Sequence, residues 1–200
     1  AKPTRDGTWD PGRFTAMVPA SDVSMKSLDR RNTRDGIGGA LVGVRKMDPP
    51  EKFSPPVAGL NSPVTAVLDF KGQDVTLSLL DPADRSSVAL SGTSRTVAGD
   101  FSAPLAHYPK GSEVWDGLMG AIRVSAYMKN TGLYMLQPYD PDRIPLIFVH
   151  GLISTPRMWR NVVNEVESDP ELRGKYQCWV FSYPTGNPPA YSALRFREEL

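Results

Sequence analysis

A short apolar segment followed by a turn and a helix most constrains the fold of this chain. Residues Ile144–Val149 form an apolar run, rich in β-branched and aromatic side chains and without polar–apolar alternation. Such a run is typical of a strand buried on both faces, as in a parallel sheet covered by helices. His150 and Gly151 end the run, and we expect Gly151 to allow a sharp turn where a side chain would obstruct the backbone.

A helix is predicted directly after this turn. Thr155 is suited to be its N-cap, and Pro156 to be its first residue, since proline has a fixed φ and no N–H to leave unpaired. Helical spacing then places one apolar stripe on Trp159, Val162, Val163 and Val166. The sequence therefore predicts a strand–turn–helix unit.

A second buried strand is predicted at Gln177–Tyr183, before a final helix that begins near Ala190. Right-handed crossovers make two such strands parallel. Because ligands bind beyond the carboxyl ends of strands in open α/β sheets, the best location for an active site is the edge where residues 150–152 and 183–187 emerge.

The segment Ile144–Leu200 resembles the N-terminal part of a bacterial lipase-like or esterase-like α/β hydrolase. The resemblance lies in the His150-Gly151 loop, the helix start at Met158-Trp159 and the Phe-Ser-Tyr-Pro-Thr-Gly exit at residues 181–186. It implies an α/β fold class, with the start of an α/β-hydrolase parallel sheet preceded by a β-rich N-terminal region. A turn in some other α/β protein is the alternative, because a His-Gly dipeptide alone has little specificity.

The resemblance also implies a site. In that family the loop after this strand supplies one backbone donor of the oxyanion hole, which stabilises the negative charge formed on a carbonyl oxygen during acyl transfer. Carried onto this chain, the donor is the N–H of Leu152, with His150 and Gly151 forming the loop. Ile153 and Tyr183 are predicted to contact the substrate.

The catalytic triad that such an enzyme needs does not fit within these 200 residues. No Gly-x-Ser-x-Gly occurs, and the nearest sequence, Gly92–Thr96, lacks the second glycine. Of the two histidines, His107 precedes the first α/β strand and His150 belongs to the oxyanion loop, where we expect it to hold the loop by hydrogen bonds. Ser154 is explained better by helix capping or exposure.

We therefore expect the nucleophile and triad to lie beyond residue 200, and the 200-residue chain alone to be inactive. Ala1 is not an initiator methionine, and the last helix has no residue that closes it, which favours a piece of a longer protein. A non-catalytic hydrolase-like binding or scaffold protein is the alternative. An acyltransferase or a peptidase also remains open, because the fold hosts many chemistries.

Upstream, we predict an extended, Pro-rich region at residues 1–63 and a β-rich meander or sandwich at 64–138, before the truncated hydrolase part at 139–200. A hairpin is predicted between Val64–Phe70 and Asp74–Asp81, where apolar and polar residues alternate as in a half-buried strand. Short helices are predicted at residues 22–31 and 114–122. The glycines of residues 36–43 lack dinucleotide-loop spacing and predict a turn that leads into a strand at residues 40–45.

Composition excludes few classes of function. The net charge of +1 gives no electrostatic reason to expect nucleic-acid binding, and no apolar run is as long as a membrane span. The single cysteine, Cys178, is predicted to be a small buried hydrophobic residue. We expect no cofactor or metal, a small-molecule or lipid ester as substrate, and, from the resemblance, a bacterial cell-envelope location; the sequence does not indicate the oligomeric state.

The hydrolase interpretation depends on one geometric arrangement. It requires Ile144–Val149 to be enclosed within its sheet, and the Leu152 N–H to be left unbonded by its own backbone. A strand at the margin of the sheet, or a Leu152 N–H already bonded within its own backbone, would overturn the hydrolase assignment.

Overall fold

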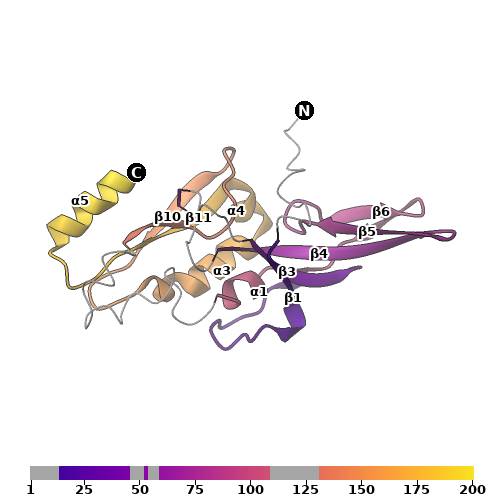
Figure 1. Cartoon of the computed structure of the whole chain (residues 1–200), viewed down its shortest axis with the longest axis horizontal. Coiled ribbons are helices and arrows are strands. Elements are labelled where there is room, and N and C mark those ends of the chain that lie inside the picture. Colours follow the sequence, from indigo (N-terminus) through magenta and orange to yellow (C-terminus); the bar gives the residue numbers. More distant parts are fainter. Residues whose placement is uncertain (1–13, 46–51, 54–58, 109–130) are drawn as a thin grey trace. The chain divides into compact units, whose positions relative to one another are not determined.

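The computed structural model describes residues 14–45, 52–53, 59–108 and 131–200. The chain divides into two compact units, each described here by itself. Unit 1 is Ala1–Arg45 with Asn61–His107, and unit 2 is Lys46–Leu60 with Tyr108–Leu200. Figure 1 labels their helices and strands.

A four-stranded sheet with the order β1-β3-β4-β5 is the largest element of unit 1. Its strands are β1 (Ala16–Pro19), β3 (Gly39–Arg45), β4 (Leu60–Lys71) and β5 (Asp74–Leu80). β1 pairs antiparallel with β3, and β4 with β5. Gly72, in the turn between β4 and β5, has a φ of +63°, which glycine adopts without steric cost. The predicted hairpin and the predicted strand at residues 40–45 are confirmed.

The β4–β5 hairpin exposes an apolar face. Leu68 lies opposite Leu77, and Phe70 lies opposite Val75. These four side chains share one face of the sheet, because residues two apart along a strand point the same way. Their exposed fractions lie between 51% and 64%. The alternation therefore predicts the strand correctly, but Val75 and Leu77 on its apolar side are exposed instead of buried.

Short elements complete the described part of unit 1. They are η2 (Ala20–Asp22), β2 (Thr33–Arg34), β6 (Ser87–Leu90), β7 (Thr93–Thr96), β8 (Gly99–Asp100) and α1 (Ala103–Ala106). β2 pairs with β8 and β6 with β7, each as a separate two-stranded sheet. The helix predicted at residues 22–31 is wrong, because within residues 14–45 the only helical turn ends at Asp22. The helix predicted at residues 114–122 lies outside the described residues.

Unit 2 contains a three-stranded sheet with the order β10-β11-β9. The strands are β9 (Gly132–Met135), β10 (Ile144–Val149) and β11 (Tyr176–Ser182). The helices are η5 (Pro156–Trp159), α3 (Arg160–Ser168), α4 (Pro170–Lys175) and α5 (Pro189–Glu199). β10 runs parallel to β11, as predicted for these two segments, whereas β9 is antiparallel to β11.

The predicted α/β fold class is wrong. The described strands are mostly antiparallel and lie in several small sheets, with few helices, so the fold is β-rich. β10 with β11 is a parallel pair and Ile37 with Val97 forms an isolated parallel bridge, but no parallel α/β-hydrolase sheet is seen among the described residues. The physical reason is that the crossover through α3 and α4 makes one parallel pair, and β9 then joins it in the opposite direction.

β10 lies at the margin of its sheet, which contradicts the predicted enclosure. Ile144 is 54% exposed and Val149 41% exposed, whereas β11, in the centre, is buried from Gln177 to Ser182. Periodicity alone cannot distinguish an enclosed strand from an apolar edge strand. Pro145 does carry that information, because a proline cannot donate to a ladder and is found on edge strands.

The core of unit 2 forms around β11. Leu60, Leu133, Met135, Trp179 and Phe181 make up its buried apolar cluster. Cys178 is fully buried, so its predicted burial is confirmed, and burial together with the nearby Glu167 raises the pKa of its thiol. Along α3, Val163 is buried but Val162 is 45% exposed, so the predicted apolar stripe is narrower than expected.

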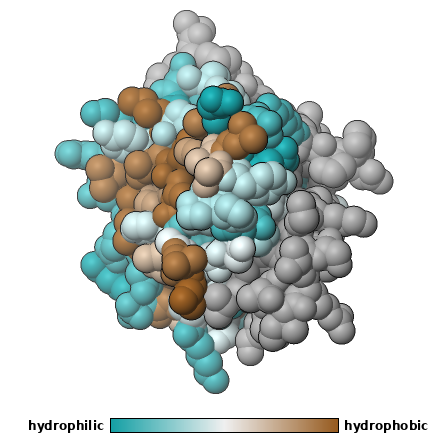
Figure 2. Space-filling model, turned by 90° about the vertical axis from the view of Figure 1, so that its left-hand side faces the viewer, coloured by the Kyte–Doolittle hydropathy of each residue, from teal (hydrophilic) through white to brown (hydrophobic). Residues whose placement is uncertain are grey.

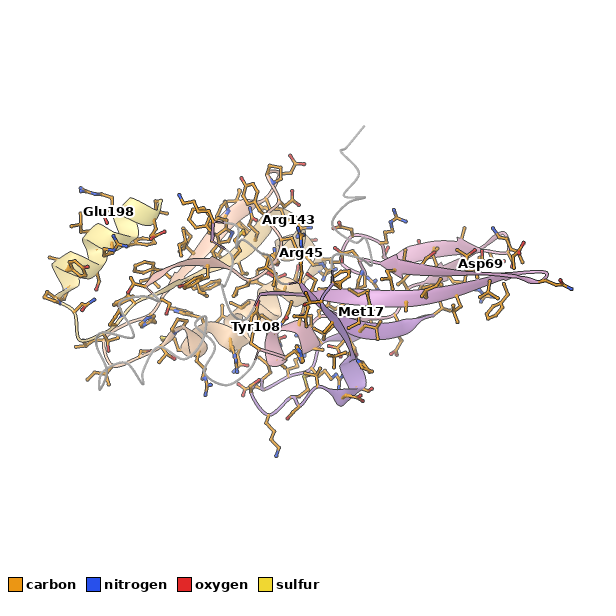
Figure 3. All side chains as sticks on the ribbon, viewed as in Figure 1. Met17, Arg45, Asp69, Tyr108, Arg143 and Glu198 are labelled. Carbon is orange, nitrogen blue, oxygen red and sulfur yellow. The ribbon has the colours of Figure 1, made fainter. Side chains whose placement is uncertain are left out.

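A buried amide fixes the entry to β10. Gln177 Nε2 donates to the carbonyl oxygens of Asp140 and Arg143 at 2.8 and 2.9 Å. The side chain of Arg143, labelled in Figure 3, pairs with the Asp140 carboxylate at 3.1 Å. These contacts tie the turn before β10 to the central strand, so the direction of β10 is set from its first residue.

Candidate functional site

The loops that follow β10 and β11 begin at the same edge of the unit 2 sheet. Val149 lies opposite Phe181 in the parallel ladder, so residues 150–155 and 183–188 leave the sheet side by side. Figure 1 shows α5 following β11 on this side of the molecule, and Figure 2 views the same side. This is the edge at which the sequence places its candidate site.

His150 is buried at the start of the first loop, with only 2% of its surface exposed. Its Nδ1 lies 3.2 Å from the Gly151 carbonyl oxygen, and its Nε2 lies 3.4 Å from the backbone nitrogen of Tyr183. One neutral tautomer satisfies both contacts: Nδ1–H donates to Gly151, and Nε2 accepts from Tyr183. Burial lowers the pKa of the imidazole below its ordinary value of 6.5. His150 is thus placed to hold the loop by hydrogen bonds.

Tyr183 is the principal partner of His150. Its ring stacks on the imidazole with centroids 4.3 Å apart and an angle of 15° between the planes, and it also stacks on Phe181 at 5.4 Å. Its hydroxyl donates to the backbone carbonyl of His150 at 2.5 Å. The predicted substrate contact by Tyr183 remains a prediction, and the hydroxyl that would make it is directed at the loop backbone.

Leu152 and Ile153 form the exposed tip of the loop. Their side chains are 74% and 79% exposed. The N–H of Leu152 makes no hydrogen bond to another described residue. Ile153 has a φ of +53°, which is unfavourable for a β-branched side chain. Strain of this kind persists only where surrounding contacts determine the conformation. Because the Leu152 N–H is unbonded within the described residues, the loop presents a backbone donor to its surroundings.

Contacts further along the chain anchor the other end of the loop. Thr155 is the N-cap of η5, where its side chain accepts a hydrogen bond from Arg157 N–H at 3.2 Å, and Pro156 is the first residue of η5, as predicted. The indole Nε1–H of Trp159 donates to the Val149 carbonyl at 3.2 Å. This bond was not predicted, because spacing in the sequence gives Trp159 only a place on an apolar stripe.

The steric role predicted for Gly151 is wrong. A side chain added at Gly151 would meet no atom within 4 Å, and its φ lies outside the left-handed region. The left-handed backbone of the loop occurs at Ile153, two residues later. The sharp turn thus depends on the contacts of His150 and Tyr183 and not on a missing side chain.

The chemistry of this edge is that of a backbone donor within an apolar surface. Val149, Leu152, Ile153 and Met158 are exposed around it, and hydrophobic side chains gather on the side shown in Figure 2. The Ser154 hydroxyl donates to the Met158 sulfur at 3.1 Å, which agrees with a local role. Among the described residues, no group of three or more His, Cys, Asp and Glu side chains could hold a metal ion.

No helix among the described residues is long and apolar enough to cross a bilayer. Comparison with known proteins gives no family: no family model, no curated protein and no solved structure matches this chain.

Proposed function

We propose that residues 150–153 form half of the oxyanion hole of a serine hydrolase that acts on carboxylic esters or lipids. The observation that supports this most is the Leu152 N–H, which is unbonded within the described chain and lies in a loop held at both ends. A fixed backbone donor of this kind stabilises the oxygen of a tetrahedral intermediate without reorganising during the reaction. The marginal position of β10 fails the condition on which the resemblance to an α/β hydrolase depended. The proposal therefore does not rest on that fold, and only the geometry of the loop supports it.

The surroundings of the donor suit an ester with an apolar acyl group. Leu152, Ile153 and Met158 are all more than half exposed, so they can be buried by an apolar part of a substrate. Sites for small molecules are mostly apolar, with a few polar groups that fix orientation. In this arrangement the Leu152 N–H binds the carbonyl oxygen, and the neighbouring side chains contact the carbon chain.

The serine, its base and the orienting acid are proposed to lie beyond residue 200. The serine would attack the ester carbonyl, the oxyanion would accept a hydrogen bond from Leu152, and loss of the alcohol would leave an acyl-enzyme that water hydrolyses. In this proposal the 200-residue chain supplies only one part of the active site. It should therefore bind but not turn over an activated ester.

The test is to replace the Leu152 amide with an ester linkage, using the α-hydroxy analogue of leucine in a semisynthetic longer protein. This change removes the N–H and keeps the side chain. Loss of one oxyanion-hole donor is expected to lower kcat about 100- to 1,000-fold on a p-nitrophenyl ester. The matched control is Leu152→Ala, which keeps the N–H and should change mainly KM. An unchanged kcat without the amide, or turnover by the 200-residue chain alone, contradicts the proposal.

The β4–β5 hairpin supports a second candidate, a non-catalytic binding or scaffold protein. Leu68, Phe70, Val75 and Leu77 form a contiguous exposed patch on one sheet face, and patches of this kind mark interaction sites. Asp69, labelled in Figure 3, alternates with them and pairs with Lys71 at 3.4 Å. The hairpin thus has a polar and an apolar side, and the apolar side is available for docking.

This candidate is tested with the paired substitution Leu68→Ser and Leu77→Ser. Sedimentation velocity reports self-association, and flotation with phosphatidylethanolamine–phosphatidylglycerol vesicles reports binding to a lipid surface. Association by the wild-type chain that the double variant loses supports the docking role. Thr76→Ser, on the opposite face of β5, is the control and should behave as wild type. If the wild type, the double variant and Thr76→Ser show the same self-association and the same vesicle binding, the docking role is contradicted.

A further inference from the structure

Tyr183 contacts residue 150 in three ways across 33 positions of sequence. Its backbone N–H lies 3.4 Å from His150 Nε2, its ring stacks on the imidazole, and its hydroxyl donates to the His150 carbonyl. Each contact constrains a different part of His150, namely its protonation, the plane of its ring and its backbone. Together they leave the imidazole one orientation.

The tautomer follows from these contacts. A donor faces Nε2, so Nε2 must carry a lone pair, and the proton of the neutral ring is on Nδ1. That Nδ1–H donates to the Gly151 carbonyl oxygen at 3.2 Å. The imidazole therefore transmits the position of Tyr183 to the next peptide group of the loop.

The direction of the Leu152 N–H follows from that bond. The Gly151 carbonyl and the Leu152 N–H belong to one planar trans peptide, in which the C=O and N–H bonds point in opposite directions. When the carbonyl points at the His150 ring, the N–H must point away from it. The exposed tip formed by Leu152 and Ile153 agrees with this orientation.

We infer that Tyr183 is a positioning residue: it holds His150 as the Nδ1–H tautomer, and the bond from His150 to Gly151 turns the Leu152 N–H outward. We call this series of contacts, from Tyr183 through His150 to the Gly151–Leu152 peptide, the relay. It rests on the observed contacts alone. Its meaning for catalysis depends on the proposed oxyanion role of Leu152. In that case Tyr183 acts through His150 and the Gly151–Leu152 peptide and does not touch the substrate.

The relay predicts sensitivity to acid. Protonation makes Nε2 a donor that faces the N–H of Tyr183, so that bond is lost. Nδ1–H can still donate to Gly151, but repulsion at Nε2 should displace the ring and, with it, the Gly151–Leu152 peptide. The titratable group packed against His150 is the Tyr183 phenol, whose pKa is raised by burial, so it stays a donor. Burial lowers the pKa of His150, the backbone contacts with Gly151 and Tyr183 oppose that shift, and charged side chains of the described residues do not contribute to it.

The first experiment measures the tautomer by NMR in the 15N-labelled 200-residue chain. Long-range 1H–15N spectra distinguish Nδ1–H from Nε2–H. His150 in the wild type should be Nδ1–H at pH 8. Tyr183→Phe should retain this tautomer because it keeps the stacking and the backbone N–H, while loss of the hydroxyl bond to the His150 carbonyl should lower the 1H–15N heteronuclear NOE of Leu152. Tyr183→Leu keeps the backbone N–H but removes the ring that fixes the plane of the imidazole, so Nε2 should turn away from that N–H and the population of Nε2–H should rise. Tyr191→Phe, an exposed tyrosine on α5, is the control and should change neither readout.

A wild-type His150 that is Nε2–H, or a Leu152 heteronuclear NOE that is unchanged in Tyr183→Phe, overturns the inference even if Tyr183→Leu does not fold. Lowering the pH should protonate His150 and lower the Leu152 heteronuclear NOE in the wild type. A Leu152 NOE that does not follow the His150 titration also overturns it.

The second experiment separates this inference from the proposed function. In a longer protein with esterase activity, Tyr183→Leu should lower kcat about 10- to 100-fold, as expected from misplacement of a donor, and Tyr183→Phe by less. If the NMR results hold and kcat is unaffected even when the Leu152 amide is removed, the oxyanion role fails while the relay stands. If removal of the amide lowers kcat but Tyr183→Leu does not, the positioning role is contradicted.

Discussion

The β4–β5 hairpin and the 150–153 loop both expose apolar side chains, but different interactions hold them. In the hairpin, Leu68 and Leu77 project from a regular antiparallel ladder closed by Gly72. In the loop, Leu152 and Ile153 project from irregular backbone held by side chains. Neighbours in sequence are sufficient to form the first surface, whereas the second requires contacts between distant residues.

The difference lies in where the backbone hydrogen bonds are made. The backbone groups of each hairpin strand pair with those of the other strand. The paired residues are no more than 15 positions apart, from Thr65 with Leu80 to Lys71 with Asp74. The loop depends on Tyr183, 33 residues from His150, and on the Trp159 indole. The loop should therefore be lost whenever the unit 2 core is loosened, while the hairpin should persist.

The largest expected effect comes from Phe181→Ala. Phe181 is 1% exposed and packs against Tyr183 and Phe196. Removing a buried phenylalanine side chain typically lowers the free energy of unfolding by about 3–5 kcal/mol. Amide hydrogen exchange should show loss of protection in β11 and in its partner β10, and the 1H–15N heteronuclear NOE of Leu152 should fall, with the β4–β5 ladder unchanged.

Leu80→Ala is the reciprocal variant. Leu80 is buried with Val67 and Val97 in unit 1, so its truncation should cost about 2–5 kcal/mol there. It should leave the protection of β11 and the heteronuclear NOE of Leu152 unchanged. Loss of protection in both units from either substitution would show that the two regions unfold together, and the comparison would fail.

The sequence predicts the locally determined parts of the fold. Alternation of Val75, Leu77 and Leu79 around a Lys-Gly-Gln turn is enough to predict the hairpin, and two apolar segments are enough to predict the parallel β10–β11 pair. Neither pattern specifies which face is covered or which strand is central. Only Pro145 in β10 indicates an edge strand, and the antiparallel pairing of β9 with β11 has no signal in the sequence.

The sequence predicts where the candidate site lies, but it does not predict the contacts that hold the site in place. The sequence places His150, Leu152 and Tyr183 at one edge, because parallel strands end together. It does not show that the Tyr183 hydroxyl bonds to the His150 carbonyl, or that the strained residue is Ile153 and not Gly151. Those features depend on side-chain directions that are set only after the strands have paired.

His150→Ala is expected to have the next largest effect. It leaves the Tyr183 N–H and the Gly151 carbonyl without their imidazole partner, which should cost about 1–3 kcal/mol at pH 8. Burial lowers the folded-state pKa of His150 below 6.5, so below pH 6.5 the unfolded chain binds more protons than the native protein. The stability contribution is complete above that pH and is lost as the pH falls toward the folded-state pKa.

Urea unfolding of unit 2 between pH 8 and pH 5 measures this. The wild type should lose stability on acidification, and His150→Ala should lose less. Val162→Ala, at an exposed position of α3, is the control and should retain the wild-type pH dependence. Parallel curves for wild type and His150→Ala would mean that the buried imidazole is not the acid-sensitive contact of the loop.

Two glycine substitutions contrast the regions more directly. Gly72 has a φ of +63°, so Gly72→Ala should destabilise the hairpin by roughly 1–2 kcal/mol. Gly151 has open space around it and a φ outside the left-handed region, so Gly151→Ala should be tolerated or should stabilise unit 2 by about 0.4–1 kcal/mol through the unfolded state. Thermal unfolding of both variants checks the signs. A large loss from Gly151→Ala would restore the steric role predicted from sequence.

The smallest expected effect is that of Ile153→Gly. Relief of a φ of +53° should gain roughly 1–2 kcal/mol, and the added freedom of glycine in the unfolded chain should offset about 0.5–1 kcal/mol of it. Little burial is lost, because Ile153 is 79% exposed. Ser91→Gly, at a φ of +48° between β6 and β7, is the matched change in unit 1 and should stabilise by a similar amount. The two sites should differ in local mobility. Ile153→Gly should lower the 1H–15N heteronuclear NOE of Leu152, because the strained residue restricts the peptide that His150 orients. Ser91→Gly should not loosen the β6–β7 ladder. Equal effects at both positions would mean that the strain at Ile153 is ordinary turn strain, with no particular role in orienting the Leu152 peptide.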